Sequence, residues 1–330
     1  MSIKSGNSGL TINALTEGAL MAALAALLGI LGIYIPALAL LTGLVWAIPI
    51  ILLIMRHNLK VGIMGLVVSG FLISILAGPV QGFLLIINLG GMALAYGYCL
   101  KNQVSPLKTL FIGTVIAAVS TALVIILSAF AAGLPIAEWH AQFKQAINEA
   151  FKVYQEGMLE KILPSGVTPE DYKQQLFRFI DTMLPGVFVS ASMGIALVNY
   201  LIARKVLIKL QYDIPEIPPF RHWHFPWYIV WGVILGLILL LAGNHYGNQV
   251  MGIIGKNILY IYYPLLLISG ISVVVYFWKK TNLSGPVKVI IFIGVIMFMH
   301  ILFLLVLLLG LFDPLFDYRR MMENQTSSHS

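Results

Sequence analysis

Long hydrophobic runs separated by short polar connections dominate this chain. We predict nine membrane-spanning segments from these runs, at about residues 12–34, 37–55, 61–79, 81–100, 108–133, 184–206, 226–243, 257–278 and 288–312. Each run is close to the ~20 apolar residues that an α-helix needs to cross a hydrocarbon core of ~30 Å. A spanning segment must satisfy its backbone polar groups internally, so the runs are expected to be helices. The predicted fold class is all-α, a polytopic membrane bundle of about nine transmembrane helices.

The longest polar connection, residues 134–183, also has helical character. Its first half, "AEWHAQFKQAINEAFKVYQEGM", repeats aromatic and apolar residues every three or four positions. Its second half begins a further helix, with Thr168 as the N-cap and Pro169 in the first turn. The pattern therefore predicts an extracytoplasmic helical hairpin. It rests on the membrane surface and on span ends, or it covers an outward-facing pocket.

Composition supports a membrane protein and excludes a soluble domain. The chain is 59% hydrophobic and 10% charged, with a mean hydropathy of +0.93, whereas a soluble domain carries roughly a quarter charged residues. Cys99 is the single cysteine, which excludes a disulfide framework within the chain. Membrane lipid is the expected partner for most of this surface, and no nucleic-acid partner is expected despite the net charge of +7.

Lysines and arginines predict how the chain is oriented in the membrane, because cytoplasmic connections are enriched in them. Alternate connections hold most of the basic residues, from Lys4 through Arg56, Lys101 and Arg204 to Lys280. We expect a bacterial inner (cytoplasmic) membrane protein with a cytoplasmic N-terminus and residues 134–183 outside. Nine crossings then place the C-terminal end outside as well.

The connections also predict a domain organisation. Residues 1–212 form a six-span unit that includes the hairpin at 134–183. A Pro- and Trp-rich cytoplasmic linker follows at 213–225. Residues 226–330 form a three-span C-terminal extension with an amphipathic tail.

A few polar residues within the predicted spans are candidate ligand contacts, since polar groups in a bilayer are costly. They are Glu17, Gln81, Asn88 and Asn199. Gln81 and Asn88 are seven residues apart, which predicts one helix face near the outer side. The alternatives stay open: the amides bond neighbouring helices, and Glu17 remains solvated at the cytoplasmic interface.

The first span carries a broad face of small residues. Ala19, Ala22, Ala23 and Ala26 form the face that we predict to dock a partner. Small residues let a second helix approach closely, and that helix can belong either to a partner or to this same chain.

Motifs for catalysis and metal binding are missing from the sequence. It contains no P-loop, HExxH or GxSxG, and no cluster with metal-ligand spacing. We therefore predict that the protein is not an enzyme and has neither a cofactor nor a metal site. Work driven by ATP would need a separate subunit.

Two motifs give a family resemblance. The runs "IPPFRHWHFPWYIVW" and "LLGLFDPLFDYRR" resemble the YybS-like family of uncharacterised bacterial multi-pass proteins. The matching positions are Pro218, Phe220, Trp223, Pro226, Asp313, Phe316, Asp317, Tyr318 and Arg319. Physically, Asp313 and Pro314 suit a helix start. We interpret the tail as a short surface helix in which Asp317 pairs with Arg319 or Arg320, and a substrate site is the alternative.

The first six spans also loosely resemble the substrate-binding S-component of energy-coupling-factor vitamin transporters. The resemblance rests on the alanine-rich first span, the Pro-broken second span and the "GPVQG" turn. It implies six helices, an outward-facing ligand pocket, and docking of a coupling subunit with its ATPases on the alanine face. The hairpin at 134–183 and the three extra spans depart from that pattern.

Two functions follow as hypotheses. The leading one is capture or transport of a small molecule, without intrinsic ATPase activity. The alternative is a membrane scaffold or regulator that binds envelope or signalling proteins through the hairpin, the basic connection and the tail.

Overall fold

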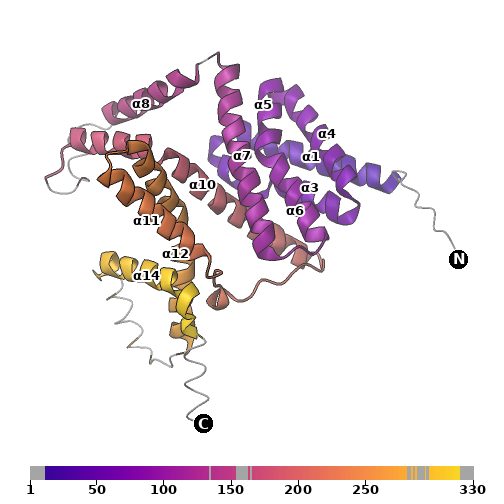
Figure 1. The fold of residues 1–330 in the computed structure, drawn as a ribbon. Coiled ribbons are helices and arrows are strands. Elements are labelled where there is room, and N and C mark those ends of the chain that lie inside the picture. The colour runs from indigo at the N-terminus through magenta and orange to yellow at the C-terminus, as the bar shows by residue number, and fades with distance from the viewer. Residues whose placement is uncertain are drawn as a thin grey trace, which may run out of the picture. The chain divides into compact units, whose positions relative to one another are not determined.

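The regular secondary structure is all helical in the part that the computed structural model describes, which comprises residues 12–133, 135–153, 166–280 and 297–319 with Leu163, Ser284, Val287 and Gly294 (Figure 1). In the first half of the chain the α-helices are α1 (Ile12–Tyr34), α2 (Pro36–Val45), α3 (Ala47–Arg56), α4 (Leu59–Ala77), α5 (Pro79–Leu85), α6 (Gly91–Lys101), α7 (Pro106–Ala131) and α8 (Ile136–Val153). In the second half they are α10 (Pro169–Lys209), α11 (Ile229–His245), α12 (Gln249–Lys280) and α14 (Met299–Phe316).

The predicted membrane bundle is confirmed. Among the described residues, seven helices or helix pairs are long and apolar enough to cross a membrane, and two shorter apolar helices cover Ile229–His245 and Ile301–Phe316. These nine elements correspond to the nine predicted segments. The start of the predicted ninth segment, before residue 297, lies largely outside the described residues.

Two predicted spans have breaks that hydropathy does not show. The second divides at Trp46 into α2 and α3. Pro49 explains this break, because its nitrogen cannot donate to the carbonyl four residues earlier. The fourth contains a π-helix, η1 (Ile86–Gly90), between α5 and α6. Single π-helical turns inside helices are frequent at functional sites.

The second arm of the hairpin and the sixth span form one helix. α10 begins at Pro169, directly after the predicted N-cap Thr168, and continues for 41 residues to Lys209. The sequence interpretation placed the arm (to residue 183) and the span (from residue 184) in separate elements. Pro185 lies inside the single helix, where it removes a backbone donor. Asn257 of α12 compensates: its Oδ1 accepts from the Gly186 N–H at 2.7 Å, and its Nδ2 donates to the Thr182 carbonyl at 2.6 Å.

The chain divides into two compact units. The first comprises Met1–Pro169 and Ala191–Glu216, and the second comprises Glu170–Ser190 and Ile217–Ser330. The first unit contains six spans, the last of them supplied by the C-terminal half of α10. The second contains the start of α10 together with α11, α12 and α14.

The core of the first unit centres on buried aromatic side chains. Small residues on neighbouring helices leave room for their rings. Tyr96 is fully buried, and its hydroxyl donates to the Ala196 carbonyl at 2.7 Å. Its ring packs edge-on against Tyr200 with centroids 5.7 Å apart. A Cβ on Gly113 would lie 2.2 Å from the Tyr96 hydroxyl oxygen, so only glycine fits there. These contacts join α6, α7 and α10.

Candidate functional site

A buried ion pair lies in the second unit. Arg319 Nη2 is 3.3 Å from Asp313 Oδ2, and the two residues are only 6% and 3% exposed. Of the ion pairs among the described residues, this one alone has both side chains buried. Burying two charges requires good geometry and further hydrogen bonds, because both lose their hydration.

The end of α14 brings these two residues together. The helix continues through Asp313 and Pro314 and ends at Phe316. Asp317 then adopts a left-handed conformation (φ 46°, ψ 64°), and its N–H donates to the Asp313 carbonyl at 2.9 Å. This turn returns Arg319 toward Asp313.

The prediction that a new surface helix begins at Asp313 is therefore wrong. Asp313 lies inside α14 rather than capping a new helix. Arg319 is buried against Asp313, and the pairing of Asp317 stays a prediction. Phe316 is exposed, as the sequence interpretation expected of the lipid-facing side. Arg320 lies outside the described residues.

The first family motif completes the same cluster. Arg319 Nη2 donates to the Trp223 carbonyl at 2.9 Å and to Ser272 Oγ at 3.1 Å. Ser272 Oγ lies 2.6 Å from the Phe220 carbonyl oxygen and 2.9 Å from that of Trp223. A short 3₁₀ turn over Phe220–His222 places both carbonyls beside α12. We name Phe220, Trp223, Ser272, Asp313 and Arg319 the motif cluster.

Two glycines let α12 and α14 approach closely enough to build the motif cluster. A Cβ on Gly270 would lie 1.9 Å from the Val306 carbonyl oxygen, and one on Gly310 would lie 1.9 Å from that of Leu266. The two backbones therefore touch where they cross. The residues predicted from the sequence do not include Gly270, Ser272 or Gly310, although the run "SGIS" at 269–272 is a signal of small residues in a span.

The motif cluster corrects one feature of the predicted topology. Nine full crossings placed residues 213–225 and the C-terminal end on opposite sides of the membrane. The 2.9 Å contact between Arg319 and Trp223 places the two motifs together, and a hydrocarbon core is ~30 Å thick. Residues 220–223 and 313–319 therefore lie on the same side.

The predicted ligand contacts in the first unit do not converge on one place. Gln81 and Asn88 are both exposed, and Asn88 lies within the π-helix η1. Asn199 is 2% exposed, and its Nδ2 donates to the Ile195 carbonyl of its own helix at 3.0 Å. Asn199 thus takes part in the packing of α10.

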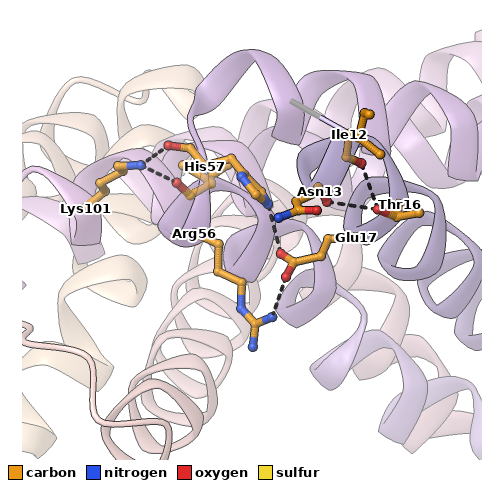
Figure 2. A network of polar contacts seen from close by, with 8 residues as sticks. Ile12, Asn13, Thr16, Glu17, Arg56, His57 and Lys101 are labelled. Carbon is orange, nitrogen blue, oxygen red and sulfur yellow. Dashed lines mark hydrogen bonds and ion pairs between the residues drawn. The ribbon is translucent and has the colours of Figure 1, made fainter. Parts of the chain in front are cut away.

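Glu17 lies in a separate polar network (Figure 2). Its carboxylate is 3.3 Å from Arg56 Nη1 and 2.9 Å from His57 Nε2, and it connects α1 to the turn between α3 and α4. Lys101 Nζ donates to the Ile54 and His57 carbonyls at the end of α3. The 19 residues of α4 (~28 Å at 1.5 Å per residue) separate this turn from the α4–α5 turn that precedes Gln81.

The predicted alanine face is divided by the fold. Ala22 and Ala26 are 0% and 3% exposed, in a helix that packs on α2, α3 and α4. Ala19 and Ala23 are exposed. Docking of a partner on this helix stays a prediction, and only the exposed pair is available to it in this structure.

An apolar groove lies on the surface of the first unit. It has a volume of about 650 Å³ and lies where α4 ends, α5 begins and α7 ends. Its lining residues are Gly70, Ser74, Pro79, Val80, Gly82, Phe83, Leu84, Ile86, Leu127, Phe130 and Ala131. Ser74 supplies the polar side chain of this set. Gly78, with φ 101°, makes the tight turn between α4 and α5.

Among the described residues, there is no group of three or more His, Cys, Asp or Glu side chains that could hold a metal ion. The absence of a cofactor and of enzyme activity stays a prediction.

The bundle of apolar helices defines the class: this is a polytopic integral membrane protein. The chain belongs to the family described as "Predicted membrane protein (DUF2232)", whose model matches residues 23–314. It is 25% identical over 317 residues to "Uncharacterized protein YybS" of Bacillus subtilis (strain 168), which covers 93% of this chain and 97% of that protein. The predicted YybS-like resemblance is confirmed. No solved structure matches the chain.

Proposed function

We propose that the first unit captures a small molecule with a substantial hydrocarbon part, and that the chain does so without its own ATPase. The observation that carries this proposal is the apolar groove between α4, α5 and α7. Its volume of about 650 Å³ falls within the ~300–1,000 Å³ typical of small-molecule sites. Six spans in one compact unit agree with the number that the S-component resemblance implies.

The lining of the groove decides which ligand class is favoured. Val80, Phe83 and Phe130 present exposed apolar side chains there. Gln81, Asn88, Asn199 and Glu17 do not line it. A polar, vitamin-like ligand would leave its hydrogen-bonding groups unpaired against such walls, which is costly. A single-chain amphiphile fits better, because its chain enters directly from the bilayer.

Substituting Ala131 with tryptophan should block capture. Ala131 lines the groove at the exposed end of α7, so an indole fills space without displacing a buried neighbour. The purified protein in nanodiscs is photolabelled with a diazirine-bearing fatty acid, and labelled peptides are mapped by mass spectrometry. We expect labelling at residues 79–86 and 127–131 to fall at least fivefold in Ala131→Trp.

The matched control is Ala122→Trp, an exposed alanine of the same helix that does not line the groove. It should label like the parent protein. Labelling spread evenly over all lipid-facing helices, and unchanged in Ala131→Trp, would show ordinary lipid contact and refute capture.

The scaffold function stays a second prediction. Affinity purification from the native membrane separates the two: a coupling subunit with ATPases favours capture and transport, whereas envelope proteins alone favour a scaffold.

A further inference from the structure

A polar pocket lies at the turn between α11 and α12, within the second unit. It has a volume of about 450 Å³, and α10 contributes one wall through Thr182. The remaining lining residues are Gly243, Asn244, Gly247, Asn248, Gln249, Gly252, Ile253 and Lys256. Unlike the groove of the first unit, this lining offers amides, a hydroxyl and an ammonium group.

Glycines and an N-cap give the pocket its shape. A Cβ on Gly243 would lie 2.4 Å from the Gly252 nitrogen, so the backbones of α11 and α12 touch here. Gly247 makes the turn with φ 65°. Asn248 then caps α12, since its Oδ1 accepts from the Met251 N–H at 3.2 Å. The Asn244 and Gln249 side chains have no such capping role among the described contacts.

The charge of the pocket favours an anion. Lys256 is the one charged residue in the lining, and no carboxylate of the described residues pairs with it. The first turn of the 32-residue helix α12 adds the partial positive charge of a helix N-terminus. Amide N–H groups of Asn244 and Gln249 can donate to the same ligand. Hydrogen bonds from charged donors to anions are the stronger kind.

We propose that this pocket binds a small anion, a phosphate or carboxylate group carried by a compact polar molecule. Lys256 supplies the charge, and Asn244 and Gln249 supply hydrogen bonds. The volume of about 450 Å³ is at the small end of ligand sites. The site shares no lining residue with the groove of the first unit, and its lining is polar where that of the groove is apolar.

The pocket also adjoins the proline position of α10. Thr182 lines the pocket, and its carbonyl accepts a hydrogen bond from Asn257 Nδ2. Asn257 directly follows Lys256 in α12. Asn257 in turn accepts from Gly186, directly after Pro185. An anion bound between Lys256 and Thr182 would therefore stabilise the packing of α12 against this part of α10.

The test uses the full chain in phosphatidylcholine nanodiscs, titrated with inorganic phosphate and, separately, with succinate at constant ionic strength. Thermal unfolding is followed by tryptophan fluorescence. We expect one of these anions to raise the Tm with saturation, and Lys256→Gln to weaken the apparent affinity at least tenfold. Lys280→Gln, an exposed lysine at the far end of α12, should change it less than twofold.

A second arm replaces a third of the phosphatidylcholine with phosphatidylglycerol. A Lys256-dependent rise in Tm in that arm alone would identify a lipid headgroup as the source of the phosphate. The proposal is overturned if neither arm shows saturable stabilisation, or if Lys256→Gln responds like the parent protein. Ala131→Trp should leave this response intact, so failure of the groove and failure of the pocket are separable.

Discussion

Replacing Arg319 with methionine should lower the free energy of unfolding of the second unit by about 3–5 kcal/mol, the usual cost of removing one partner from a buried ion pair. Asp313 would remain 3% exposed with no guanidinium beside it. The Trp223 carbonyl would also lose the donor that lies 2.9 Å away. Reversible unfolding in mixed micelles, followed by tryptophan fluorescence, measures the change.

Two variants make this result specific. Arg221→Met removes an exposed arginine from the same motif and should cost less than ~0.5 kcal/mol. The double variant Asp313→Leu with Arg319→Met should recover most of the lost stability, because it leaves no unpaired buried charge. A cost below ~1 kcal/mol for Arg319→Met would mean that the pair is solvated and the motif cluster does not form.

Replacing Gly270 with valine should be comparably damaging, by about 3 kcal/mol. The added Cβ would lie 1.9 Å from the Val306 carbonyl oxygen, a backbone atom that cannot rotate aside. α12 and α14 would have to separate, and Ser272 would move away from Arg319. The expected result is a lower Tm for the second unit in the same unfolding assay.

Gly252→Ala is the matched control for that substitution. It lies in the same helix, but nothing is within 4 Å of its added Cβ. Stability should be unchanged or slightly higher, because alanine favours a helix interior more than glycine does. If Gly270→Val behaves like Gly252→Ala, the close crossing of α12 and α14 is wrong.

Hydropathy predicted the spans well for a physical reason. A hydrocarbon core sets the length and the apolar character of each helix, so a single run of residues contains the whole signal. The break at Trp46 has a local cause in Pro49. The continuity of α10 through Pro185 has no local cause. It depends on the side-chain amide of Asn257, which lies 71 residues after its hydrogen-bond partner Gly186.

The candidate sites were harder to predict because they depend on contacts between distant segments. Trp223 and Arg319 are 96 residues apart, and no periodicity links them. The sequence did mark both motifs, through their resemblance to a family, but it suggested a surface anchor instead of a buried cluster. Glu17 was grouped with Gln81 and Asn88 because all three are polar residues within predicted spans, whereas its partners are Arg56 and His57.

The central claim is that the two family motifs meet on one side of the membrane. Cys99 is the single cysteine and is buried, so a Cys99→Ala background permits one new cysteine at a time. Arg221→Cys and Asp317→Cys are both at exposed, polar positions, and each is treated with a membrane-impermeant maleimide in right-side-out and inside-out vesicles. We predict that both cysteines react in the same vesicle preparation. Reaction of the two cysteines from opposite sides would contradict the motif cluster.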